Sequence, residues 1–259
     1  MQKMPLQRTE GTRNSLDDIA ISTKQQPYCR DSSGVIYCGD CLDLMKDWPD
    51  GCVDLVLTDP PYGINVMDEK RQLSRGKQCI NYGKINWDDI IPPPEVFEQI
   101  FRISTNQIIW GGNYFVEYLK NSPCWLIWDK TGRTPTDFAD CELAWTSFNT
   151  AVRKYNYMWT GYWQEYMGAK KEQRVHPNQK PVIMACWVLE HYSKPEDLIL
   201  DCYMGSGTFC VAAKKLGRRY IGIDISEEYC QIARQRLEAV DTGVPVKEQR
   251  KGQMAMFKE

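Results

Sequence analysis

Short apolar runs that alternate with amphipathic stretches predict a parallel β-sheet covered by helices. Residues 34–38 form an apolar run, residues 41–48 have helical periodicity, and residues 53–57 form a second run of the kind found in buried strands. Strand, helix and strand in this order are typical of a βαβ unit. Residues 181–240 continue the pattern as helix, strand, helix, strand and helix.

The middle of the chain departs from this order. A helix introduced by three prolines at 92–94 is followed by a strand at 107–110. Three more strand-like runs, at 125–128, 142–148 and 152–159, have no helical segment between them. We expect these three runs to form an antiparallel edge of the same sheet.

The 259 residues fit one domain, which we place at 34–240. We expect residues 1–33 to be a mobile arm and residues 241–259 a flexible tail. The polar segment 64–89 is too long for an ordinary connection, so together with 129–175 it is a candidate lid or target-recognition segment.

Composition and charge narrow the class of protein. Hydrophobic residues make up 42% and charged residues 25%, as in a globular chain, and no apolar stretch is long enough to span a bilayer. We therefore expect a cytoplasmic protein. The net charge of −2 does not indicate a polyanion partner, so nucleic acid would have to be bound by local basic clusters.

The eleven cysteines are scattered through expected strands and helices, which indicates reduced thiols. Cys38 and Cys41 have the spacing of a zinc knuckle, but no second close pair follows them. We expect no metal.

Two acids and a glycine turn in the last third of the chain predict a nucleotide-type site. Asp201 ends one expected strand, Gly205 and Gly207 form the following turn, and Asp224 ends the next strand, where a carboxylate suits two ribose hydroxyls. The turn lacks the G-x-G-x-x-G spacing that carries the pyrophosphate of a dehydrogenase cofactor.

The segment Asp59-Pro60-Pro61-Tyr62 follows the strand at 53–57 directly, so it projects from the carboxyl edge of the sheet, where α/β proteins bind ligands. Its prolines fix the backbone. A purely structural rigid turn would not need an acid and an aromatic residue as well.

These segments resemble the β-class DNA amino-methyltransferases, of bacterial and prophage type, in which the D-P-P-Y motif precedes the cofactor motif. Residues 201–208 resemble the F-x-G-x-G loop of that family, residues 176–181 its H-P-T-Q-K-P segment, and residues 39–41 its G-D-C segment. Cys202, Tyr203, Met204 and Asn178 depart from the usual residues. The resemblance covers roughly residues 35–239.

The resemblance implies an α/β, Rossmann-like, circularly permuted fold with a seven-stranded, mostly parallel sheet and S-adenosylmethionine as cofactor. Asp40 would meet the cofactor's adenine, Asp224 its ribose, and Lys180 the region of its carboxylate. The residues implied to bind the cofactor are Asp40, Cys41, Asp59, Lys180, Asp201, Tyr203, Gly205, Ser206, Gly207, Thr208, Asp224 and Ile225.

The catalytic residues implied are Asp59, Pro60, Pro61 and Tyr62. An exocyclic amine has a delocalised lone pair, so Asp59 and the Pro60 carbonyl would accept hydrogen bonds from its N–H groups and favour a pyramidal nitrogen. A base must leave the duplex to be reached, and Tyr62 offers a ring for it to stack on.

The acid at position 59 resembles the adenine enzymes and favours N6 of adenine over N4 of cytosine. Cytosine, an RNA or protein amide substrate, and a non-catalytic nucleic-acid-binding module stay open, as does a homodimer. We expect DNA phosphates to be gripped by Arg71, Arg75, Lys77, Arg133, Lys170, Lys171 and Arg174. Few elements remain to read bases, so we expect a short or relaxed target site, as in some prophage-borne relatives.

Overall fold

The computed structural model describes residues 16, 19, 22–64, 91–131, 139–160, 163–168, 171–172, 174 and 179–243. None of the helices in these ranges has the length and apolar composition needed to cross a bilayer.

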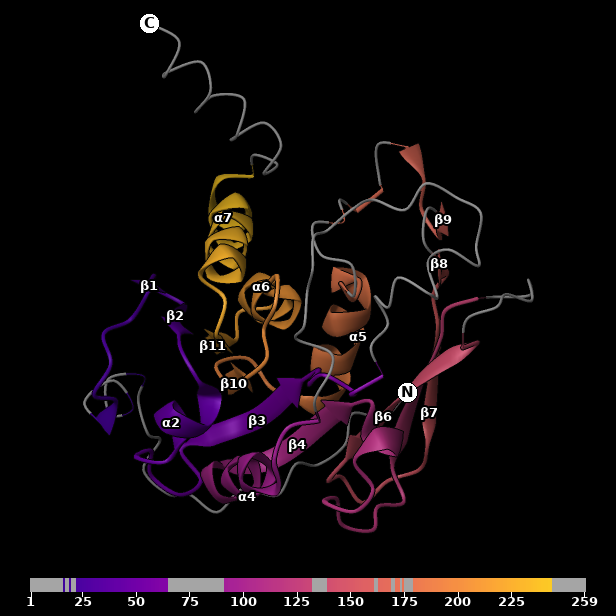
Figure 1. Cartoon of the computed structure of the whole chain (residues 1–259). Helices are drawn as coiled ribbons and strands as arrows, with labels where there is room; N and C mark the ends of the chain where they lie inside the picture. The colour runs from indigo at the N-terminus through magenta and orange to yellow at the C-terminus, as the bar shows by residue number, and fades with distance from the viewer. Residues whose placement is uncertain are drawn as a thin grey trace, which may run out of the picture.

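One mixed sheet runs through the molecule, with the strand order β1-β2-β11-β10-β3-β4-β6-β5-β7 (Figure 1). The five central strands β2, β11, β10, β3 and β4 are all parallel to their neighbours. The strands of the sheet are β1 (Cys29–Arg30), β2 (Gly34–Cys38), β3 (Val53–Thr58), β4 (Ser104–Trp110), β5 (Trp125–Asp129), β6 (Cys141–Thr146), β7 (Arg153–Asn156), β10 (Leu198–Asp201) and β11 (Arg219–Asp224).

The sheet confirms the expected class but corrects two details. Within the described residues the sheet has nine strands rather than seven. The expected antiparallel edge is mixed, because β6 pairs antiparallel with β4 and β5 whereas β7 pairs parallel with β5. The run at 152–159 also divides, since β7 ends at Asn156 and β8 (Trp159–Thr160) pairs with β9 (Trp163–Gln164) in a separate two-stranded sheet.

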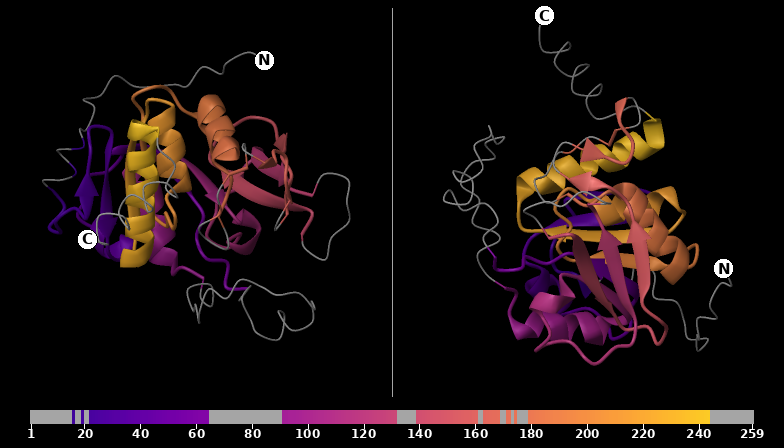
Figure 2. Two further views of the ribbon diagram at one scale, coloured as in Figure 1. Left: turned by 90° about the horizontal axis from the view of Figure 1, so that it is seen from above. Right: turned by 90° about the vertical axis from the view of Figure 1, so that its right-hand side faces the viewer.

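Helices cover both faces of the sheet (Figures 1 and 2). The helices α5 (Val182–Tyr192), α6 (Thr208–Lys215) and α7 (Glu227–Thr242) lie on one face, while α2 (Cys41–Met45) and α4 (Pro94–Ile103) lie on the other. Pro94 occupies the first turn of α4, where its missing N–H costs nothing.

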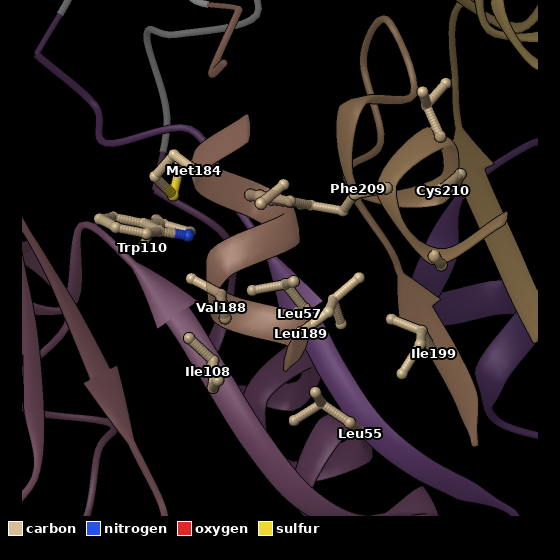
Figure 3. Close-up of a cluster of buried hydrophobic side chains, with 14 of the residues drawn as sticks. Leu55, Leu57, Ile108, Trp110, Met184, Val188, Leu189, Ile199, Phe209 and Cys210 are labelled. Carbon is tan, nitrogen blue, oxygen red and sulfur yellow. The ribbon is translucent and has the colours of Figure 1, made fainter. Parts of the chain in front are cut away.

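Alternation along the strands divides the core into two layers. Leu55, Leu57 and Ile108 point toward α5 and α6 and pack with Val188 and Phe209 (Figure 3). The neighbouring side chains Val56 and Ile109 pack on the opposite face with residues of α2 and α4. Burial on both faces explains why these strands are continuous apolar runs.

The domain begins before residue 34, so part of the segment 1–33, expected to be a mobile arm, belongs to the fold. Cys29 and Arg30 form β1 against β2, Ile19 is buried, and the Trp48 indole donates a hydrogen bond to Thr23 at 2.8 Å. At the other end, α7 extends to Thr242, and residues 244–259 lie outside the described ranges.

The candidate segment 129–175 is partly sheet, because it contains β6 and β7 as well as the pair β8 and β9. The segment 64–89 falls, except for Ile64, outside the described residues.

Candidate functional site

The functional groups gather where the central parallel strands end. Thr58 ends β3, Asp201 ends β10 and Asp224 ends β11. The register pairs Asp224 with Cys38, so Asp40 lies beside the strand of Asp224, as the resemblance implied. Because β6 runs in the opposite direction, its first residues reach the same edge.

The carboxylate of Asp59 is held from two sides. Tyr62 donates its hydroxyl hydrogen to Oδ1 at 2.5 Å, and the ammonium of Lys180 lies 2.5 Å from Oδ2. Burial raises the pKa of Asp59 above its ordinary value, and Lys180 offsets this only in part. The acid and the tyrosine of the D-P-P-Y segment therefore form one hydrogen-bonded unit with Lys180.

Lys180 bridges two acids. Its Nζ is 3.0 Å from Oε2 of Glu142, and the other oxygen of Glu142 is 2.7 Å from Nζ of Lys130. Burial alone would lower the pKa of Lys180, but the carboxylates of Asp59 and Glu142 raise it. The structure thus places the Lys180 ammonium on Asp59, while the Lys180 backbone carbonyl accepts a hydrogen bond from Thr208, the first residue of α6.

The ring of Tyr62 is part of an aromatic group rather than an open platform. It stacks on Tyr114 with centroids 4.9 Å apart and an interplanar angle of 16°, and Phe115 meets it edge-on at 6.1 Å. Gly111, with φ of 70°, lies so close that an added Cβ would be 2.1 Å from Cε1 of Tyr62. Only glycine meets both requirements.

Replacing Gly111 by alanine should destabilise the fold by about 1–3 kcal/mol through backbone strain alone, with a further cost because the Tyr62 ring must move. Urea denaturation measures the loss. Gly51→Ala is the matched control, since Gly51 has φ of 61° and nothing within 4 Å of an added Cβ. Equal losses in the two variants would mean that the ring contact contributes nothing.

Asp201 links the end of β3 to the loop that follows β10. It is 1% exposed and accepts hydrogen bonds from the Thr58 hydroxyl at 2.9 Å and from the Tyr203 N–H at 3.3 Å. Burial holds its pKa well above the ordinary value. Asp201 is therefore a buried residue that helps to fix the conformation of the loop at Tyr203.

The glycine turn leads into α6. Gly205 and Gly207 have φ of 48° and 77°, and α6 begins at Thr208. Oδ2 of Asp224 accepts the Gly205 N–H at 2.8 Å, and Oδ1 accepts the Ser226 N–H at 2.8 Å. Each oxygen keeps a second lone pair, so the carboxylate can still accept hydrogen bonds from a pair of hydroxyls.

The other predicted cofactor residues surround this turn. Asp40 caps α2 by accepting the N–H of Leu42 at 2.8 Å, and its side chain is exposed. The Cys41 thiol hydrogen-bonds with Cys202 and Tyr203, which lowers its pKa. Ile225 is 74% exposed, directly after Asp224.

A buried ion pair that the sequence did not indicate contacts the glycine turn at Ser206. Arg236 of α7 donates to the Ser206 carbonyl at 2.7 Å and lies 3.2 Å from Glu172. Glu172 also accepts the N–H of Val182 at 2.9 Å. The pair thus joins the cofactor loop to the residues that precede α5.

Two of the seven predicted DNA-contacting residues lie in the described ranges. The Lys171 N–H donates to the carbonyl of Gly168 at 3.1 Å, and the Arg174 guanidinium lies 5.9 Å from the ring centroid of Trp159. Their contact with phosphates stays a prediction. Outside the described ranges are Arg71, Arg75, Lys77, Arg133 and Lys170.

Known proteins resemble the chain over most of its length. The sequence model of the N6/N4 methyltransferases, described as DNA methylase, matches residues 128–235. The chain is 29% identical over 224 residues to "Putative methylase YubD" of Escherichia coli (strain K12), with 78% of this chain and 89% of that protein covered. It is 26% identical over 260 residues to Type II methyltransferase M2.DpnII of Streptococcus pneumoniae, with 83% and 93% covered.

A solved structure has the same fold. PvuII DNA methyltransferase, described as cytosine-N4-specific, aligns with a TM-score of 0.59 and 15% identity, and the alignment covers 87% of this chain and 93% of that one.

Proposed function

We propose that the chain, which is similar to the N6/N4 DNA methylases, uses S-adenosylmethionine and methylates N6 of adenine in DNA. The observation that carries the proposal is the Asp59 carboxylate, fixed by Tyr62 and Lys180 and joined through Thr58 and Asp201 to the cofactor loop. An acid, rather than a serine, at position 59 favours adenine.

The residues at the strand ends fit the cofactor. Asp224 keeps lone pairs for the two ribose hydroxyls, and the turn through Gly205 and Gly207 brings backbone close to the ligand. Asp40 is exposed beside it and has a second oxygen available for the adenine amino group. When bound, the cofactor supplies an electrophilic methyl group on a sulfonium.

Asp59 and the Pro60 carbonyl would accept hydrogen bonds from the two N–H groups of the base's amino group, and one of these protons leaves the nitrogen when the new C–N bond forms. This directs the nitrogen lone pair out of the ring system and toward the methyl group. The Tyr62 hydroxyl keeps Asp59 in place, while its ring packs on Tyr114. The active form of Asp59 is ionised, so the rate should fall as pH drops through its raised pKa.

The modified base is identified by expressing the chain in a host without other DNA methylation. Nucleoside mass spectrometry should show N6-methyladenine, and mapping should show a short or relaxed target site. N4-methylcytosine as the main product would contradict the base assignment, and a long strict site would contradict the expected specificity. If no methylated base is found, the remaining alternative is a non-catalytic nucleic-acid-binding module.

A further inference from the structure

The ammonium of Lys180 has an oxygen acceptor for each of its three hydrogens. Oδ2 of Asp59 is 2.5 Å away, Oε2 of Glu142 is 3.0 Å away, and the Tyr62 hydroxyl oxygen is 3.3 Å away. The Lys180 side chain is only 6% exposed, so this charge is neutralised by the two acids rather than by water.

Glu142 is itself fixed. It stands near the start of β6, and its second oxygen lies 2.7 Å from the ammonium of Lys130. Burial alone would raise the pKa of Glu142, but the ammonium groups of Lys180 and Lys130 lower it to about 2. Charges of alternating sign thus run from Asp59 through Lys180 and Glu142 to Lys130.

The arrangement matters because Asp59 has two tasks in the proposed function. It must stay ionised in a buried site, which requires a cation, and it must accept a hydrogen from the amino group, which requires a free lone pair. A buried ammonium paired with Asp59 alone would keep Asp59 ionised, but it would also compete with the amino group for the lone pairs of Asp59. A second carboxylate on the same ammonium weakens that competition.

We infer that Glu142 is a positioning residue for methyl transfer: it shares the ammonium of Lys180 with Asp59, so that Lys180 orients the catalytic carboxylate without saturating it. The inference rests on the proposed role of Asp59. Glu142 need not touch the base or the cofactor.

The inference predicts opposite pH effects for two substitutions. The charged and titratable groups around Asp59 are Tyr62, Lys180, Glu142 and, through Thr58, Asp201. Glu142→Gln removes a negative charge, so the pKa of Asp59 falls and the acid limb of the rate profile moves to lower pH. Lys180→Met removes the positive charge, so the limb moves to higher pH, by about one unit or more.

The test is single-turnover transfer of labelled methyl to unmethylated plasmid DNA at saturating cofactor, followed across pH. Glu142→Gln should lower the plateau rate roughly 10- to 100-fold, as expected for a misplaced catalytic group, and leave cofactor affinity unchanged. Glu238→Gln is the matched control, because Glu238 pairs with Arg234 on the surface of α7 and should leave rate and profile unchanged.

A wild-type plateau in Glu142→Gln, or a rate loss with an unshifted acid limb, would overturn the inference. Glu142→Asp keeps the charge with a shorter reach, so it should lose part of the rate with the limb in place, and a wild-type rate there would also overturn it. Wild-type protein that transfers no methyl to DNA would instead refute the proposed function itself.

Discussion

Asp59→Ala should lower the methyl-transfer rate by at least about 10²–10³-fold, because it removes the acceptor that reorganises the amino group in the transition state. Cofactor affinity should change little, since Asp59 contacts Tyr62 and Lys180 rather than the glycine turn. Single-turnover assays measure the rate, and calorimetry measures the affinity for S-adenosylmethionine.

Asp54→Asn is the control variant, because it removes the charge of another carboxylate close to Asp59 in the sequence. Asp54 lies at the opposite end of β3, where it accepts the N–H of Leu198 at 2.8 Å. Asp54→Asn should lower the stability of the fold but leave the methyl-transfer rate unchanged. Turnover that survives in Asp59→Ala would refute the mechanism.

Asp224→Ala should weaken S-adenosylmethionine binding by at least roughly 10- to 100-fold, because the loss of even one of the two hydrogen bonds to this charged acceptor costs about 1.5–3 kcal/mol. The variant also releases the N–H groups of Gly205 and Ser226, so the turn should lose order as well. Calorimetry measures the affinity, and thermal unfolding shows whether the fold remains.

Two comparisons make the result specific. Asp224→Asn keeps an acceptor oxygen and the side-chain shape, so its loss of affinity should be intermediate. Asp241→Ala removes an exposed acid of α7 that pairs with Lys214 at 2.5 Å, and it should leave the affinity unchanged. Unaltered affinity in Asp224→Ala would remove this residue from the cofactor site.

The hydrophobic pattern was sufficient to predict the parallel centre of the sheet. Strands buried on both faces are apolar throughout, and glycine turns and prolines mark their ends. The ranges of β2 and β3 were therefore predicted within a residue, and the ends of β10 and β11 were predicted at Asp201 and Asp224. The acids at the strand ends followed, because parallel strands bring their carboxyl ends to one edge.

The mixed edge was not predictable in the same way. Successive side chains of a strand alternate between the two faces of the sheet whichever way its partner runs, so nothing within residues 153–156 distinguishes the direction in which β7 pairs with β5. The two residues of β1 are too few to carry any pattern and depend on pairing with β2.

The charge network at Asp59 was only partly visible in the sequence. Lys180 was assigned by resemblance to the region of the cofactor carboxylate, whereas its ammonium lies between Asp59 and Glu142. These residues are far apart in the chain and meet only because β6 runs antiparallel to β4. The one available sign was an acid inside an otherwise apolar strand, which is uncommon unless it is paired.

The hydrogen bond from Thr58 to Asp201 connects the strand that leads to Asp59 with the strand that leads to the glycine turn. Linkage then constrains their energetics, because any factor by which DNA tightens cofactor binding must equally be the factor by which cofactor tightens DNA binding. If that factor exceeds one, a fall in the concentration of methyl donor lowers the apparent affinity for DNA, by at most the same factor. Supply of the methyl donor would then influence how long the protein stays on DNA, as well as how fast it modifies it.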